Sequence, residues 1–219
     1  MHPRYSSQTL PRFIVFEGLD GAGTTTQAQA LVDGLNNSGH PAVMTSEPTT
    51  GPIGSMIRLI LRGRLATADT RELIDRQLAY LFAADRFDHI YNSTDGVERQ
   101  VAKGFTVVST RYFFSSYAYN GRTAEDFDLV DRLNRDFPLP GLVVYLKVPM
   151  AVSLNRLAKR DVREHYEHED ELERVATNFN RLFEPIRDRV LEYNSDGNKE
   201  ELAARILAEV TGRLATVRT

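Results

Sequence analysis

Residues 16–27 read Phe-Glu-Gly-Leu-Asp-Gly-Ala-Gly-Thr-Thr-Thr-Gln, which is the most informative segment of the chain. It follows the phosphate-binding pattern G-x-x-x-x-G-K-[ST], with Gly18 and Gly23 in place and Thr25 at the final hydroxyl position. Thr24 stands where the pattern has lysine. The match predicts a phosphate-bearing ligand. The mismatch removes the cation that normally reaches the outer phosphates of a nucleotide.

The sequence on both sides of the glycine loop supports this interpretation. Residues 13–16, Phe-Ile-Val-Phe, form an apolar run typical of a buried parallel strand. Apolar residues at helical spacing follow the loop, namely Ala28, Leu31, Val32 and Leu35. A strand, a glycine loop and a helix N-terminus together form an anion site, because backbone N–H groups point at the ligand. An ordinary glycine-rich turn is the alternative.

Composition excludes several classes of function. The chain has 219 residues, which suits one α/β domain, and its net charge of −3 argues against a nucleic-acid partner. It has no cysteine, which excludes disulfides and thiol catalysis and is typical of a reducing compartment. No apolar run is long enough to span a membrane, so we expect no membrane partner. Residues 1–11 lack an apolar signal core, so we expect a loose N-terminal tail.

Apolar, β-branched runs recur along the chain and predict the strands of one sheet. These runs are residues 13–17, 42–46, 105–110, 142–148 and 190–194. Helical patterns lie between them, which indicates parallel strands with helices on both faces of the sheet. We therefore predict an α/β fold of the P-loop NTPase type: a three-layer sandwich with a five-stranded parallel sheet.

One segment late in the chain is rich in charge. Residues 156–170 carry many charged side chains and few apolar anchors. Such a run is most often the solvated face of a helix. In an enzyme that transfers phosphate, it is also a natural closing lid, which we place at about residues 153–170.

A helix predicted over residues 73–90 carries a candidate base-binding pair. Phe82 and Arg86 are four positions apart, so they share one face of this helix. A flat ring beside a guanidinium group suits a planar base, because the ring stacks and the guanidinium donates to a carbonyl. On spacing alone, a core phenylalanine with a surface arginine is the more common arrangement.

A second polar cluster follows the predicted strand at residues 105–110. Ligands of a parallel sheet lie at the carboxyl ends of its strands, so Arg111 there is placed to hold a phosphate. Ser115 and Asn120 carry groups that hydrogen-bond a base edge. The alternative is a structural turn in which the aromatic residues 112–114 pack in the core.

Four separated segments of the chain resemble the thymidylate kinase family, which belongs to the P-loop nucleoside monophosphate kinases. They are residues 16–23, Glu47-Pro48 with residues 54–58, residues 81–86 (Leu-Phe-Ala-Ala-Asp-Arg), and residues 111–119. The segment at 81–86 is far more specific than the glycine loop. The resemblance implies one nucleoside monophosphate kinase domain over residues 12–219, which transfers the γ-phosphoryl group of ATP to dTMP with Mg²⁺ as cofactor.

The resemblance also implies roles for the residues of the acceptor site. Asp20 would accept a hydrogen bond from the sugar 3′-hydroxyl, and Tyr119 would crowd the 2′ position and favour deoxyribose. Phe82 would stack on thymine, and Arg86 would donate to a thymine carbonyl. The other expected substrate-binding residues are Glu47, Pro48, Arg111, Ser115, Asn120 and Tyr166.

On the donor side, the resemblance implies that the loop and the start of the following helix bind ATP. The expected ATP-binding residues are Gly18, Leu19, Asp20, Gly21, Ala22, Gly23, Thr24, Thr25 and Thr26. Thr25 and Glu167 are the expected metal ligands, with Glu17 and Glu47 as alternative carboxylates for the outer shell of the metal.

Two residues depart from the family pattern close to the chemistry. Thr24 replaces the loop lysine, and Thr110 replaces the aspartate that precedes the arginine after the third strand. Because one positive and one negative charge are lost, the local sum is unchanged, and we interpret this as a paired replacement. Many family members with glycine at position 21 carry their catalytic cation in the lid. The expected catalytic residues are therefore Arg111, Arg156, Arg160 and Arg163, with Lys159 as a further lid candidate.

Two other functions stay open at this point. Asn120 differs from the residue that the family usually has there, which allows a kinase for another pyrimidine deoxynucleotide. The changes at Thr24 and Thr110 allow a non-catalytic nucleotide-binding protein. The resemblance also implies a cytoplasmic homodimer that associates through helices beside the base site. Four apolar residues would form either this face or part of the core: Leu73, Ile74, Leu78 and Leu81.

Overall fold

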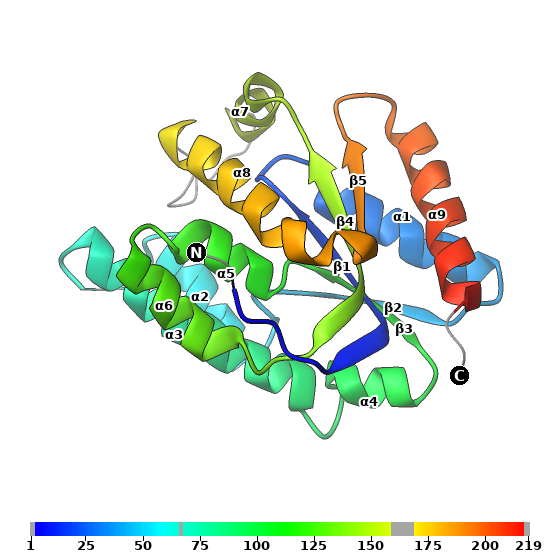
Figure 1. Cartoon of the computed structure of the whole chain (residues 1–219), viewed down its shortest axis with the longest axis horizontal. Helices are drawn as coiled ribbons and strands as arrows, with labels where there is room; N and C mark the ends of the chain where they lie inside the picture. The colour runs from blue at the N-terminus through cyan, green and yellow to red at the C-terminus, as the bar shows by residue number, and fades with distance from the viewer. Residues whose placement is uncertain (1–2, 66–67, 159–168, 217–219) are drawn as a thin grey trace.

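The computed structural model describes residues 3–65, 68–158 and 169–216, and these form a sheet between two layers of helices (Figure 1). The sheet has five parallel strands in the order β2-β3-β1-β4-β5. The strands are β1 (Thr9–Gly18), β2 (Ala42–Ser46), β3 (Thr106–Thr110), β4 (Leu139–Lys147) and β5 (Val190–Asn194). The predicted fold class is confirmed.

Helices flank the sheet and separate successive strands. Those described are α1 (Thr24–Asn37), α2 (Pro52–Leu61), α3 (Arg71–Tyr91), α4 (Val97–Ala102), α5 (Phe113–Asn120), α6 (Ala124–Asn134), α7 (Met150–Ala158), α8 (Glu169–Phe183), the 3-10 helix η1 (Glu184–Arg189) and α9 (Lys199–Thr216). None of them, within the described ranges, combines the length and apolar character that a bilayer crossing requires.

Two apolar cores lie on opposite faces of the central strand β1. Ile14 and Phe16 point into one core with α1 and α9, whereas Phe13 and Val15 point into the other with α3, α5 and α8. All four side chains are fully buried. Because β1 pairs with β3 on one side and β4 on the other, the glycine loop emerges in the middle of the carboxyl edge of the sheet.

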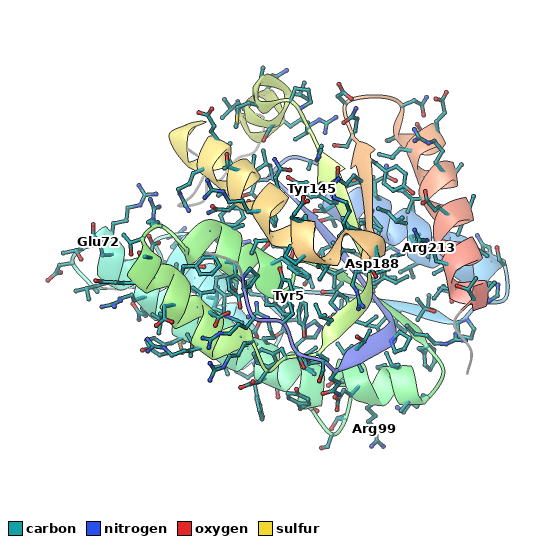
Figure 2. The ribbon with its side chains drawn as sticks, in the orientation of Figure 1. Tyr5, Glu72, Arg99, Tyr145, Asp188 and Arg213 are labelled. Atoms are coloured by element: carbon teal, nitrogen blue, oxygen red, sulfur yellow. The ribbon has the colours of Figure 1, made fainter. Side chains whose placement is uncertain are left out.

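The N-terminal residues differ from the expected loose tail over residues 1–11. Strand β1 begins at Thr9, and Leu10 pairs with Pro140 of β4. The Tyr5 hydroxyl donates to the carbonyl oxygen of Leu182 at 2.7 Å, where the N-terminal segment crosses the body of the molecule (Figure 2). These anchors join residues far apart in the chain, so the local composition carries no sign of them.

Only part of the expected lid at residues 153–170 can be placed. Helix α7 includes residues 153–158 and α8 begins at Glu169, whereas residues 159–168 lie outside the described residues. The expected site residues Lys159, Arg160, Arg163, Tyr166 and Glu167 all belong to this segment.

Candidate nucleotide site

The glycine loop joins β1 to α1 in a conformation that demands glycine. Gly21 and Gly23 have φ values of 82° and 88°, in the left-handed region that side chains disfavour. A Cβ atom on Gly18 would lie 2.7 Å from the carbonyl oxygen of Leu146. Gly23 is also the N-cap of α1 and offers no side chain to its first turn. The N–H groups of that turn are therefore suited to an external anion.

A cavity of about 470 Å³ opens in front of the loop, and we call it the phosphate cavity. Its lining includes the expected ATP-binding residues Leu19, Asp20, Gly21, Gly23, Thr24, Thr25 and Thr26. Thr110, at the end of β3, lines the same cavity as Thr24. The two positions that depart from the family pattern therefore face one common space.

Two arginines of the described residues line the phosphate cavity, and only one of them was predicted to have a role. Arg111 was expected there, whereas Arg58 was not. Arg58 lies on α2 and donates to the carbonyl oxygens of Pro48 and Thr49. Its place within the matched segment 54–58 was the signal that could have identified it.

Arg156 lies beside the loop but is directed at backbone oxygens. Its Nη1 donates to the carbonyl oxygen of Gly21 at 2.9 Å, and its Nη2 donates to that of Ser195 at 2.9 Å. It is absent from the described lining of the phosphate cavity. In this structure Arg156 therefore fastens the loop to the turn after β5, and its expected catalytic role stays a prediction.

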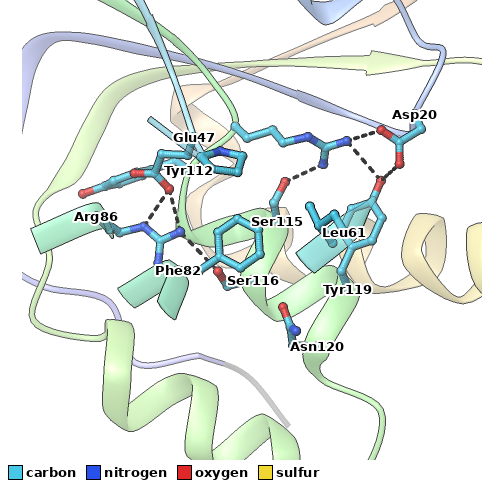
Figure 3. Close-up of a pocket in the computed structure, with 12 residues that line it drawn as sticks. Asp20, Glu47, Leu61, Phe82, Arg86, Tyr112, Ser115, Ser116, Tyr119 and Asn120 are labelled. Carbon is cyan, nitrogen blue, oxygen red and sulfur yellow. Dashed lines mark hydrogen bonds and ion pairs between the residues drawn. The ribbon is translucent and has the colours of Figure 1, made fainter. Parts of the chain in front are cut away.

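A second, narrower cavity of about 70 Å³ adjoins the first, and we call it the acceptor pocket (Figure 3). The expected substrate-binding residues that line it are Asp20, Glu47, Pro48, Phe82, Arg86, Arg111, Ser115, Tyr119 and Asn120. Arg86 and Asp20 stand at opposite ends of the pocket in Figure 3. The structure thus brings together side chains that are separated by up to a hundred positions in the sequence.

Arg86 is a buried arginine, which excludes the surface position that spacing alone favoured. Its side chain is 1% exposed, and its Nε and Nη2 donate to Glu47 Oε2 at 2.9 and 2.6 Å. Nη2 also donates to Ser116 and Nη1 to Asn134. Glu47 in turn bonds His89 through its other oxygen at 3.0 Å. Sequence reasoning did not identify these partners, because none is adjacent to Arg86 along its helix.

The other end of the acceptor pocket is a cluster of Asp20, Arg111 and Tyr119. Arg111 Nη2 donates to Asp20 Oδ1, and the Tyr119 hydroxyl donates to Asp20 Oδ2 at 3.1 Å. The guanidinium lies 5.0 Å from the centre of the Tyr119 ring. Burial raises the pKa of Tyr119 above its ordinary value, so the phenol remains the donor to Asp20.

Helix α5 supplies the wall between these two ends. Asn120 is buried and donates to the carbonyl oxygen of Asp75 at 3.1 Å. Ser115 accepts a hydrogen bond from Arg111 Nη1 at 3.0 Å and donates to Glu17 at 2.7 Å, so its hydroxyl holds the arginine as well as lining the pocket. The aromatic residues 112–114 pack in the core, which is the structural role that was the alternative interpretation of this segment.

Glu17 and Glu47 are both unsuited to the outer-shell role that was left open for them. Glu17 is fully buried and absent from the described lining of the phosphate cavity. Glu47 lines that cavity, but both of its oxygens bond Arg86 or His89. Glu167, the other expected carboxylate, lies outside the described residues.

Several known proteins that are similar to this chain belong to one family. The family model described as thymidylate kinase matches residues 16–206. A probable thymidylate kinase of Methanococcus aeolicus is 34% identical over 204 residues, which cover 91% of this chain and 95% of the relative. A probable thymidylate kinase of Thermococcus kodakarensis is 37% identical over 175 residues, which cover 78% of this chain and 84% of the relative. The thymidylate kinase of Akkermansia muciniphila is 31% identical over 215 residues, with 97% and 98% covered.

Proposed function

The chain belongs to the thymidylate kinase family, and we propose that it transfers the γ-phosphoryl group of ATP to dTMP, giving dTDP and ADP. One observation carries the proposal beyond the family match. Arg111 lines both the acceptor pocket and the phosphate cavity, so a single guanidinium stands where a donor phosphate and an acceptor phosphate would meet.

Transfer of a phosphoryl group depends on positioning and charge neutralisation more than on covalent chemistry. The loop N–H groups and the first turn of α1 would hold the phosphates of ATP. Arg58 and Arg111 would neutralise the acceptor side of the phosphate cavity. Arg160 and Arg163 remain the candidates for the charge that Thr24 does not supply.

In the acceptor pocket, Phe82 would stack on thymine while the buried Arg86 directs its remaining N–H group toward a thymine carbonyl. Four of the five N–H groups of that guanidinium are already used by Glu47, Ser116 and Asn134. The orientation of Arg86 is therefore set before the base arrives. Asp20 would accept the 3′-hydroxyl, beside the Tyr119 ring that crowds the 2′ position.

Mg²⁺ fits the phosphate cavity as an ion carried mainly by ATP. Among the described residues, no group of three His, Asp or Glu side chains is arranged to hold a metal. Thr25 lines the cavity, and Mg²⁺ commonly takes oxygen ligands such as its hydroxyl together with substrate phosphates. When bound, Mg²⁺ would offset charge on the transferred phosphate.

The decisive experiment is to measure ATP-dependent phosphorylation of dTMP by the purified protein, with dUMP, dCMP and ribothymidine monophosphate as competing acceptors. We expect turnover with dTMP in the presence of Mg²⁺ and weaker turnover with the ribonucleotide. Tight binding of ATP and dTMP without any product would contradict the proposed transfer. Preference for another acceptor would contradict the assigned substrate.

We also propose a homodimer that forms through α3. Leu73, Tyr80 and Phe87 lie seven residues apart on this helix and are 51%, 56% and 61% exposed, which makes one apolar stripe. Leu78 was a candidate for this face, but it is fully buried in the core. Light scattering should give twice the chain mass, and Y80E/F87E should give a monomer. A wild-type monomer would contradict the proposed dimer. The cytoplasmic location stays a prediction.

A further inference from the structure

Glu17 is a buried carboxylate that the proposed transfer does not use. It lies at the end of β1 with no exposed surface. Burying a charged group is unfavourable unless hydrogen bonds compensate for lost water. Glu17 Oε1 accepts the backbone N–H groups of Tyr112 and Ser115 at 2.9 and 3.3 Å, and Oε2 accepts the Ser115 hydroxyl at 2.7 Å. The two Ser115 donors belong to the first turn of α5, and the Tyr112 N–H belongs to the turn between β3 and α5.

That turn carries Arg111 in an unfavourable backbone conformation. Arg111 has a φ of 70°, and it is the only residue other than glycine with positive φ within the described part of the chain. Such a conformation persists only where the surroundings hold it. The Arg111 N–H donates to Phe16 and its carbonyl accepts from Ser109, both at 2.9 Å. Glu17 holds the next N–H, that of Tyr112.

Glu17 also acts on the Arg111 side chain through Ser115. Because the Ser115 hydroxyl gives its hydrogen to Glu17, its lone pairs face Arg111 Nη1, which donates to it at 3.0 Å. Asp20 holds the other terminal nitrogen of the guanidinium. Glu17 therefore holds both the backbone and the side-chain direction of Arg111, which lines the two cavities.

We propose that Glu17 is a positioning residue for phosphoryl transfer, which fixes Arg111 at the junction of the acceptor pocket and the phosphate cavity. This inference rests on the proposed function of the chain. It assigns to Glu17 an effect on the rate of transfer through Arg111, beyond its contribution to folding.

The charge state of Glu17 gives the proposal a signature of its own. Burial raises its pKa to about 7, opposed by the charge of Arg111 and assisted by that of Glu47. Tyr145 of β4 is near enough for the charge of Glu17 to act on its phenol. When protonated, Glu17 itself becomes a donor toward Ser115, which removes the acceptor of the serine hydrogen and loosens the contact with Arg111. The ionised form is therefore the one that positions Arg111.

The test compares E17Q, S115A and E17D with the wild-type protein. We expect kcat with dTMP to fall about 10- to 100-fold in E17Q, on the scale of a small misplacement of a catalytic group. We expect an unchanged KM for ATP, a smaller loss in S115A and partial recovery in E17D. The matched control is D131N, because Asp131 also accepts a backbone N–H, that of Arg4, and a side-chain hydroxyl, that of Tyr117, away from both cavities.

The pH profile separates positioning from folding. Wild-type kcat/KM for dTMP should fall as the pH drops through about 7, and the ratio of wild-type to E17Q activity should fall with it. The second ionisation of the substrate phosphate, near pH 6, is common to both proteins and cancels in this ratio. A ratio that does not vary with pH would overturn the inference, as would folded E17Q and S115A with wild-type kcat. Absence of wild-type turnover would instead overturn the proposed function.

Discussion

The acceptor pocket and the phosphate cavity lie side by side and are built in opposite ways. The pocket of about 70 Å³ is lined by side chains that bond one another, such as Arg86 with Glu47 and Arg111 with Asp20. The cavity of about 470 Å³ is lined by the glycine loop and four threonines, Thr24, Thr25, Thr26 and Thr110, and on its acceptor side by Arg58 and Arg111. The acceptor side is thus held in place before ligands arrive, whereas the loop side offers backbone N–H groups without the usual lysine.

The two regions therefore differ in how much sequence change they tolerate. Each charged side chain of the acceptor pocket has a partner on another element, so one substitution leaves a buried or partly buried group unpaired. In the phosphate cavity, backbone N–H groups can bind phosphate whatever the side chain, so we expect Thr24 and Thr110 to be tolerated there. Four predictions test this contrast, in order of decreasing expected effect.

Removing the arginine that lines both regions should have the largest effect. We expect R111A to lower kcat about 100- to 1000-fold, because one lost electrostatic donor is typically worth about 3–4 kcal/mol. The measurement is the initial rate at saturating ATP and dTMP. R132A is the matched control, since that arginine is exposed on α6 and should leave kcat unchanged. A loss of less than about tenfold in R111A would place Arg111 away from the transferred group.

The burial of Glu17 beneath the acceptor side should make the stability of the protein depend on pH. Folding raises the pKa of Glu17 from its ordinary 4.5 to about 7, so between these values the folded state binds more protons than the unfolded state. The free energy of unfolding should therefore fall as the pH rises through this range, by roughly 3 kcal/mol. Urea denaturation at pH 5 and pH 7.5 measures it. E17Q should lose this contribution, and an identical slope in both proteins would contradict the assignment.

Phe82 tests whether the pocket binds a base by stacking. F82A should raise KM for dTMP by about tenfold to a hundredfold, because stacking of one base on an aromatic ring is worth roughly 1–3 kcal/mol. KM for ATP should not change. F127A controls for the loss of a ring, since Phe127 packs against the same core but does not line the pocket. Equal increases of KM for dTMP in both variants would exclude stacking by Phe82.

The smallest effect concerns the paired replacement in the phosphate cavity. T24K and T110D each introduce one unbalanced charge, whereas T24K/T110D restores the balance of the family pattern. We expect kcat of the double variant to be higher than the product of the two single effects predicts. The difference should correspond to a coupling energy of about 1–2 kcal/mol. A double-mutant cycle of rates measures this quantity. Simple additivity would show that the two positions changed independently.

Much of this architecture was predictable because it is local in the chain. The strand at residues 42–46 and the helix carrying Phe82 follow from hydrophobic periodicity, and the glycine loop follows from its spacing. The residues of the acceptor pocket were predictable because their segments resemble those of a known family. In both cases, the information lies in short, contiguous stretches of sequence.

The remaining features depend on pairs of residues that are distant in sequence. Glu17 meets Ser115 across 98 positions, and Arg86 meets Glu47 across 39. Arg156 was expected to supply charge from the lid, but its bond to Gly21 spans 135 positions. No local pattern reports such contacts, so the tertiary fold is needed to distinguish a residue that holds the site from one that reaches the substrate.

The N-terminal segment has a practical consequence for anyone who produces this protein. Arg4 is tied to Asp131 of α6, and Tyr5 packs on Phe113 and Phe114 of α5, the helix that carries Tyr119. An affinity tag or fusion partner joined upstream would pull on this attachment. Helix α9 packs on the opposite face of the sheet, beside α1, so a carboxy-terminal fusion is the safer choice for assays and immobilisation.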